Sequence, residues 1–376
     1  MATVKLGDIA IEAKSSNKGD KTGIRIVGLE HLTPSNVTLS SWSEDTENTF
    51  TKEFSKGDVL FGRRRAYLKK AAVAPFDGIC SGDITVIRAI EDKVDPDLLP
   101  FIIQNDFLFE FAVGKSAGSL SPRVKWTHLK EFAIELPSMP EQSKLAETLW
   151  SINETKNAYE DLINKTDELV KSQFIEMFKK CDREKLGEYI LQVRGISYKP
   201  KDLSEGLKEG FVTLLRANNI ANNVLNFEDV QFVSEGRVSD DQIIREGDIL
   251  ICASSGSLEH VGKAALCMPD MEYTFGAFCK LIRPIGKLYP EYIAGYMRTD
   301  SYRNTISDLA QGSNINNLRN EHINDLMIPI PSDEQQRDFI DLQRQSDKSK
   351  FICLITFNDN LMLSFKSMWI CSRIRT

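Results

Sequence analysis

The sequence predicts a mixed α/β (α+β) protein built as two globular units, each followed by a long helix. Three observations lead to this fold class. Residues 141–178 contain no glycine or proline, which is typical of one uninterrupted helix. Short alternating segments such as 23–29 and 83–88 indicate half-buried strands. Several motifs of the first half also recur, in the same order, in the second half.

The first long helix is expected within residues 137–180. Its larger apolar residues follow one another in steps of four and three once a few polar residues share the seam: Leu145, Leu149, Ile152, Tyr159, Ile163, Val170 and Met177. This heptad-like pattern is typical of a coiled coil. Since a helix rises ~1.5 Å per residue, the segment would be roughly 55–60 Å long, more than one small domain needs. We therefore expect a spacer arm whose seam binds a partner.

The duplication rests on pairs of motifs that keep their order along the chain. They are Lys5-Leu6-Gly7 with Lys185-Leu186-Gly187, Lys56-Gly57-Asp58 with Glu246-Gly247-Asp248, Gly118-Ser119 with Gly312-Ser313, and Pro137-Ser138-Met139-Pro140-Glu141-Gln142 with Pro331-Ser332-Asp333-Glu334-Gln335. This order predicts a globular domain at 1–136, a spacer helix at 137–180, a second domain at 181–327 and a second spacer helix at 328–376. Residues 353–360 are weak helix formers, so the end of the second arm departs from the first.

Composition narrows the class of protein. The 376 residues allow two domains, and 27% charged with 41% hydrophobic residues are globular values. No apolar run is long enough to span a bilayer and no signal peptide precedes the first strand-like segment, so we expect no membrane partner. The seven cysteines are scattered and form no CxxC pair, which indicates reduced thiols and a cytoplasmic location. The net charge of −7 argues mildly against nucleic-acid binding, although affinity depends on where basic residues cluster.

One basic cluster stands out in the first half. Arg63, Arg64, Arg65, Lys69 and Lys70 lie close together in the sequence. They are either a solvated strand edge or a DNA contact, in which arginine forks read guanine and lysines neutralise phosphates. A second candidate is the small-residue loop at 118–125, which carries Ser119, Arg123 and Lys125. This loop is either a second DNA contact or a plain connector between two elements.

The second half has polar rather than basic candidates at the corresponding places. Ser254, Ser255 and Ser257 follow a buried strand where the first half has its arginines. This loop lacks the GxxxxGK[ST] order of a phosphate-binding loop, which argues against a nucleotide site. Two interpretations remain: its hydroxyl groups contact DNA phosphates, or it is a plain turn. The later loop carries Asn314, Asn316, Asn317 and Arg319, and is either an asparagine-rich turn or a reader of adenine.

The motifs of common enzymes are missing. The four histidines have no metal-ligand spacing, and no HExxH, GxSxG, GxGxxG or Asn/Asp-Pro-Pro-aromatic sequence is present. Paired acidic residues such as Asp240-Asp241 lie in turn-like sequence and indicate surface groups. We therefore expect no catalytic residue and no metal site in this chain.

The order of these elements resembles the specificity (S) subunit of type I restriction-modification enzymes over essentially the whole chain. The Lys-Leu-Gly openings, the Gly-Asp motifs, the Gly-Ser loops and the two proline-rich helix starts carry the resemblance, together with residues 171–178 at the end of the first arm. Each motif alone is weak, and the two ordered sets are more specific.

The resemblance implies two target-recognition domains separated by two long antiparallel helices. Each domain would read one half of a split sequence in double-stranded DNA, and the helices would set the gap and dock two methyltransferase subunits. Restriction/translocase subunits would join the complex, and S-adenosylmethionine, ATP and magnesium would be bound by these partners rather than by this chain. The alternative is a coiled-coil scaffold whose globular ends bind protein and not DNA. A fused methyltransferase is opposed by the missing catalytic tetrapeptide.

Overall fold

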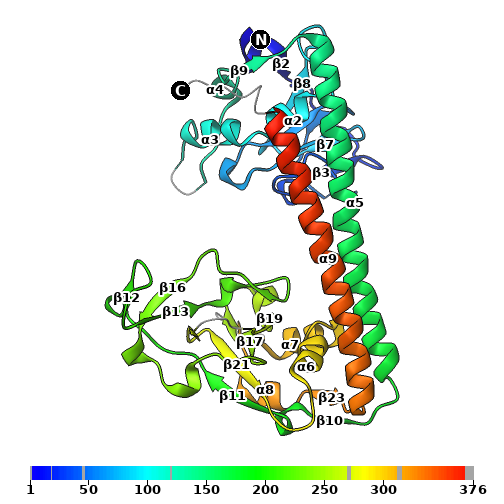
Figure 1. Ribbon diagram of the computed structural model, residues 1–376. Helices are drawn as coiled ribbons and strands as arrows, with labels where there is room; N and C mark the ends of the chain where they lie inside the picture. Colours follow the sequence, from blue (N-terminus) through cyan, green and yellow to red (C-terminus); the bar gives the residue numbers. More distant parts are fainter. Residues whose placement is uncertain are drawn as a thin grey trace. The chain divides into compact units, whose positions relative to one another are not determined.

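The computed structural model describes residues 2–17, 19–44, 47–118, 121–268, 272–310 and 316–368, with side chains described from residue 3 to residue 350. The chain divides into two compact units, Met1–Glu160 with Ile355–Thr376, and Asp161–Leu354. Both divisions fall within long helices, α5 (Met139–Phe178) and α9 (Asp333–Met368) (Figure 1). The two predicted arms are therefore helical. No helix in the described part of the chain combines the length and the apolar character that a membrane span requires.

Unit 1 contains one antiparallel sheet, one mixed sheet and a short strand pair. Strands β2 (Ala10–Glu12), β8 (Ile84–Ala89), β5 (Val59–Gly62) and β6 (Ala71–Val73) form a four-stranded sheet in that order. Strands β3 (Arg25–Val27), β7 (Gly78–Cys80) and β4 (Lys52–Phe54) form a second sheet. β1 (Ala2–Lys5) pairs with β9 (Ala133–Leu136) just before α5. Helices α1 (Leu6–Ile9), α2 (Leu99–Ile103), α3 (Asp106–Gly114) and α4 (Trp126–Leu129) contribute to the core against β5.

Unit 2 repeats this arrangement. β11 (Ile190–Arg194), β21 (Cys279–Pro284), β17 (Ile249–Cys252) and β19 (Ala264–Leu266) form its four-stranded sheet, and β10 (Arg183–Lys185) pairs with β23 (Met327–Pro329) before α9. A second sheet has the order β12 (Leu203–Ser204), β16 (Gln231–Ser234), β13 (Phe211–Leu215), β20 (Tyr273–Phe275). A short hairpin joins β14 (Ile220–Ala221) to β15 (Val224–Leu225). Its helices are α6 (Pro290–Met297), α7 (Asp300–Ala310) and α8 (Asn320–Asn324).

The strand pairing confirms the tandem duplication. In each unit the same four strands follow in the same order, β2-β8-β5-β6 and β11-β21-β17-β19. Each second sheet also contains one parallel pair, β3 with β7 and β13 with β20. These two units differ mainly in the strands added around that parallel pair.

The repeated Gly-Asp motif has a structural cause in both units. Gly57 and Gly247 have positive φ angles of 90° and 83°, which favour glycine. The next residue, Asp58 or Asp248, is almost fully buried. The Asp58 carboxylate accepts hydrogen bonds from the Ser55 backbone N–H and from the Arg88 guanidinium, each at 2.7 Å. Asp248 accepts equivalent bonds from the Arg245 N–H at 2.7 Å and from Arg283 at 2.8 and 2.9 Å.

The start of each long helix is held by a capping serine and a buried glutamine. The Ser138 N–H donates to Glu141 Oε2 at 3.0 Å, and the Ser332 N–H donates to Gln335 Oε1 at 3.0 Å. Gln142 Oε1 then accepts from the Asp95 N–H at 3.0 Å. Gln336 Oε1 accepts from the Tyr289 N–H at 2.9 Å in the same way. The sequence comparison of Glu141-Gln142 with Glu334-Gln335 was thus wrong by one residue, since Gln335-Gln336 occupies the equivalent place.

Within unit 2 the two long helices are antiparallel, as the family resemblance implies. Asp167 on α5 pairs with Lys350 on α9, and further along α5 the Phe174 ring lies 5.1 Å from the Phe339 ring. Val170, Phe174 and Phe339 are buried in the main core of this unit. The backbone of α9 is helical to Met368, so the weak helix formers do not interrupt it. Residues 369–376 lie outside the described residues.

Candidate nucleic-acid interface

In unit 1 the structure brings the two predicted loops together. Arg64 and Arg123 form an antiparallel bridge beyond the end of β5. The Arg65 N–H donates to the Pro122 carbonyl at 2.8 Å, and the Val124 N–H donates to the Arg63 carbonyl at 3.0 Å. Two basic segments far apart in the sequence therefore form one edge.

Unit 2 has the same edge with different side chains. β18 (Ser254–Ser255) pairs antiparallel with β22 (Asn316–Asn317), so that Ser254 faces Asn317 in register. The Leu318 N–H donates to the Ala253 carbonyl at 2.8 Å, which matches the bond between Val124 and Arg63. Ser254 and Asn317 therefore occupy the places of Arg64 and Arg123. We call the paired segments, 63–65 with 122–124 in unit 1 and 253–255 with 316–318 in unit 2, the reading edges.

Asp83 organises the arginines at the reading edge of unit 1. Its carboxylate accepts from Arg123 Nε at 2.6 Å and lies 3.5 Å from Arg64 Nη1. Arg64 Nε also donates to Ser121 Oγ at 2.6 Å. The hydrogen bond from Arg123 is the main cause that lowers the pKa of Asp83, while partial burial opposes it and the neighbouring positive charges assist it. Both guanidinium groups are held in place and still partly exposed, which favours recognition without a large loss of side-chain entropy.

The other predicted basic residues of unit 1 fall into three groups. Lys69 Nζ pairs with Asp106 at 2.6 Å, and Lys70 Nζ donates to the Leu29 carbonyl at 2.7 Å. The side chains of Arg65 and Lys125 are exposed and have no polar partner within the described parts of the chain. Among the predicted basic contact residues of unit 1, these two are therefore the most accessible to phosphate. Arg63 is half-buried, and its Nε lacks a hydrogen-bond partner among the described residues.

The predicted polar residues of unit 2 are mostly accessible. Ser257, Asn317 and Arg319 are exposed, and Ser254 and Ser255 are half-buried. Asn316 Nδ2 donates to the carbonyls of Ser255 and Gly256 at 3.4 Å each, which ties the edge together. Ser119 and Asn314, the other two predicted contact residues, lie outside the described residues. Arg319 is the N-cap residue of α8 just beyond β22, as Lys125 is the N-cap residue of α4 in unit 1.

Two residues that bond to the reading edges, Asp83 and Phe278, were not identified from the sequence. The Asp83 carbonyl accepts from the Arg63 N–H at 3.0 Å, and the Phe278 carbonyl accepts from the Ala253 N–H at 2.9 Å. The two residues precede β8 and β21 at the same register. Only strand pairing reveals their equivalence, because the sequences around them are unlike.

The predicted partner seam of α5 packs largely on the chain itself. Leu145 and Leu149 contact the α2 region through Leu98, and Val170 lies in the unit 2 core. The other predicted seam residues, Ile152, Tyr159, Ile163 and Met177, are half-buried. Leu162 and Leu169 on another face are about half exposed, at 49% and 54%. Contact of the seam with a partner stays a prediction, and these two leucines, together with Ile175 at 56%, are the most exposed large apolar side chains of the helix.

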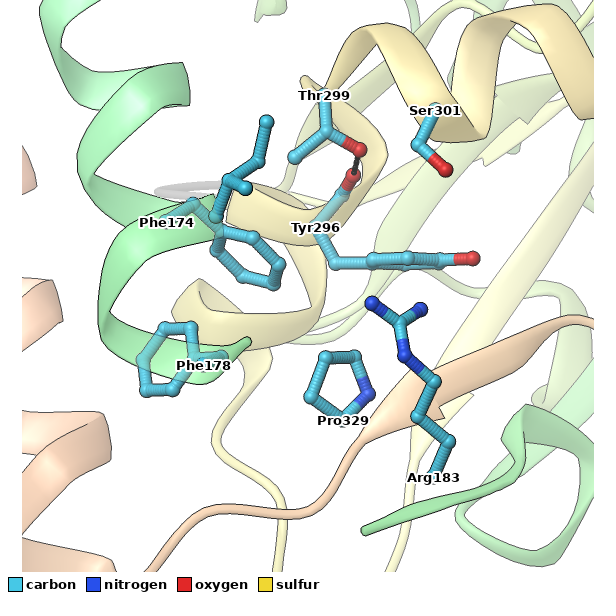
Figure 2. Close-up of a pocket in the computed structure, with 8 residues that line it drawn as sticks. Phe174, Phe178, Arg183, Tyr296, Thr299, Ser301 and Pro329 are labelled. Carbon is cyan, nitrogen blue, oxygen red and sulfur yellow. Dashed lines mark hydrogen bonds between the residues drawn. The ribbon is translucent and has the colours of Figure 1, made fainter. Parts of the chain in front are cut away.

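A small pocket lies at the end of α5 in unit 2 (Figure 2). It is lined by Phe174, Phe178, Arg183, Tyr296, Thr299 and Pro329, and Figure 2 shows the Arg183 side chain reaching toward the Tyr296 ring. Its volume of about 30 Å³ accommodates one or two water molecules and no nucleotide. Among the described residues, no three or more histidine, cysteine, aspartate or glutamate side chains lie close enough together to bind a metal ion.

The family follows from comparison with known proteins. Residues 1–168 and 187–352 each match the model of the type I restriction modification DNA specificity domain. The chain belongs to this family. The chain is 39% identical over 145 residues to the StySPI specificity subunit of Salmonella potsdam, covering 39% of this chain and 31% of that protein. It is 37% identical over 165 residues to the EcoKI specificity subunit of Escherichia coli K12, covering 42% and 36%. These matches span about a third of each curated relative.

Solved structures of this family share the fold. The S subunit of a type I restriction-modification system from M. genitalium aligns with a TM-score of 0.54 and 12% identity, over 100% of this chain and 96% of that chain. A chain from a type I R-M system aligns with a TM-score of 0.50 and 20% identity, over 96% and 95%. The predicted fold class, two specificity domains in tandem with long helices, is confirmed.

Proposed function

We propose that this chain is the specificity subunit of a type I restriction-modification complex, and that each domain reads one half of a split DNA target. One observation carries this proposal: the same reading edge recurs in both domains with different chemistry. Unit 1 presents Arg64 and Arg123, and unit 2 presents Ser254 and Asn317 in their places. A duplicated frame with exchanged polar side chains is what recognition of two unlike half-sites requires.

The residues suggest a division of tasks at the DNA. An arginine held in a fixed orientation matches guanine O6 and N7 in the major groove, and an asparagine matches adenine N6 and N7. Arg64 and Asn317 suit these roles, whereas the exposed Arg65, Lys125 and Arg319 suit phosphate contacts that position the domains. With a net charge of −7, the isolated chain would bind DNA weakly and depend on basic surfaces of its partners.

The chemistry of the complex would belong to the partners. In this proposal the chain itself is non-catalytic, the two helices dock two methyltransferase subunits, and restriction/translocase subunits complete the assembly in the cytoplasm. S-adenosylmethionine, ATP and magnesium would be bound by those subunits. The helices would also set the number of base pairs left unread between the half-sites.

The test is to coexpress the chain with the methyltransferase from the neighbouring gene and to map methylated adenines across the host genome. A split motif with a gap of fixed length is the expected result. Arg64→Ala should then degrade recognition in only one half-site, because Arg64 belongs to unit 1 alone. Absence of methylation and of DNA affinity, despite an intact complex with the methyltransferase, would instead support the scaffold alternative.

A further inference from the structure

One turn occupies the same place in both domains and presents opposite chemistry. In unit 1 the turn Ser81-Gly82-Asp83 joins β7 to β8, and the Ile84 N–H donates to the Ser81 carbonyl at 3.0 Å. In unit 2 the turn Gly276-Ala277-Phe278 joins β20 to β21, and the Cys279 N–H donates to the Gly276 carbonyl at 2.9 Å. The two turns have the same length and the same closing bond. Asp83 and Phe278 are therefore structural equivalents.

Backbone bonds attach this turn to the reading edge. The Phe278 carbonyl accepts from the N–H groups of Ala253 and Ser254, at 2.9 and 3.0 Å. Ser254 is in turn paired with Asn317. Phe278, Ser254 and Asn317 therefore belong to one connected backbone frame. A side chain on such a frame is positioned by hydrogen bonds rather than by a flexible loop.

The side chains of Asp83 and Phe278 differ in how much of each is exposed to solvent. The Asp83 side chain is mostly covered, with 21% exposed, because it binds Arg64 and Arg123. Phe278 is 66% exposed, the largest exposure among the large hydrophobic residues described. Single exposed apolar residues are common on protein surfaces. This one is distinguished by its place, since unit 1 has at that place the residue that organises the reading edge.

We propose that Phe278 is a specificity-determining residue of the second domain and contacts the C5-methyl group of a thymine in the major groove. This inference rests on the proposed function and deepens it. The hydroxyl of Ser254 and the side-chain amide of Asn317, its partner in the strand pair, are suited to hydrogen bonds with base edges. Thymine presents the one apolar group on the base edges of that groove, and phenylalanine is among the residues that contact it. In unit 1, Asp83 instead aligns two arginines for guanine.

The experiment uses the full chain in complex with its methyltransferase partner, after the split target of the wild type is known. The Arg64→Ala variant identifies the half-site of unit 1, so the other half-site belongs to unit 2. A set of duplexes is then made, and in each duplex a single thymine of that second half-site is replaced by deoxyuridine, which lacks the C5-methyl group. Affinity of wild type, Phe278→Ala and Leu207→Ala is measured on each duplex. Leu207 is 55% exposed elsewhere in unit 2 and serves as the matched control.

The expected result is a loss confined to one position. Deoxyuridine there should weaken the wild type and Leu207→Ala by about fourfold, the effect of one methyl group withdrawn from an apolar contact. Phe278→Ala should bind the thymine duplex more weakly than wild type and should not distinguish thymine from deoxyuridine. Retention of the half-site of unit 1 by Phe278→Ala would show that the variant is folded.

Several results would overturn the inference. Among them are an unchanged target preference in Phe278→Ala, a deoxyuridine effect that persists in this variant, and a second half-site without thymine. A loss of affinity that is equal on all duplexes would point to a wedge between bases, and would overturn the methyl contact as well. If the wild-type complex shows no split target at all, the proposed function itself fails, and the two failures are thus distinguishable.

Discussion

Removal of the buried carboxylate of the Gly-Asp motif should destabilise the two domains to different extents. In unit 2 the Arg283 side chain that pairs with Asp248 is only 14% exposed. In unit 1 the Arg88 side chain that pairs with Asp58 is 43% exposed. Asp248→Ala therefore leaves a guanidinium largely out of water, whereas Asp58→Ala leaves one that water can reach. The duplication supplies the comparison, since both substitutions change the same residue of the same motif.

The difference in exposure sets the magnitudes. Loss of one partner of a buried ion pair costs about 3–5 kcal/mol. Arg283 keeps a bond to the Ile243 carbonyl at 3.1 Å, which favours the lower end of that range. For Asp58→Ala, the loss of hydrogen bonds to a charged group that stays hydrated costs about 1–3 kcal/mol. Opening of the β17 strand should thus become easier by roughly two to three and a half orders of magnitude, and opening of β5 by roughly one to two.

Hydrogen exchange read by mass spectrometry measures each domain separately and needs no assumption that the chain unfolds in one step. Peptides from β17 and β5 are compared in wild type, in the two variants, and in Asp308→Ala, which changes an exposed aspartate of unit 2. Exchange in β17 should accelerate strongly in Asp248→Ala and stay unchanged in Asp308→Ala. Equal acceleration in the two motif variants, or unchanged exchange of β17 in Asp248→Ala, would refute the reasoning.

Three further predictions follow from single residues. Because the pKa of Asp83 is lowered in the folded state, its stabilising effect is present at neutral pH and is lost as the pH falls below the ordinary value of 3.8 and through the folded pKa. The difference in melting temperature between wild type and Asp83→Asn should therefore shrink toward low pH, and a constant difference would contradict this. Arg65→Ala should weaken binding to all DNA sequences alike and reduce the salt slope by about 1, measured by anisotropy in a salt series; a base-specific effect would exclude a phosphate contact. Burial raises the pKa of the Cys80 thiol to about 12, so Cys181, which is less buried, should be alkylated first by iodoacetamide at pH 8, and equal rates would be inconsistent with that burial.

The sequence was informative wherever a local rule requires a particular residue. A glycine at positive φ before a buried aspartate, a serine that caps a helix, and a long segment without glycine or proline are local features, so the duplicated domains and both long helices were predictable from the sequence. The same local signals failed where two residue types can serve one role. Gln335 replaces Glu141 as the capping acceptor, and this exchange shifted the comparison of the helix starts by one residue.

Contacts between distant segments were decided by the tertiary structure alone. The sequence singled out Arg64 and Arg123 separately, and strand pairing made them one edge with Asp83 between them. It marked Ser254 and Asn317 as candidates, and only the register of β17 and β21 placed Phe278 beside them. The physical reason is that a hydrogen-bonded sheet joins residues by register, and register depends on the packing of the whole domain rather than on neighbours in the chain. The sequence thus determined which elements form, and the packing of those elements decided which side chains meet at each reading edge.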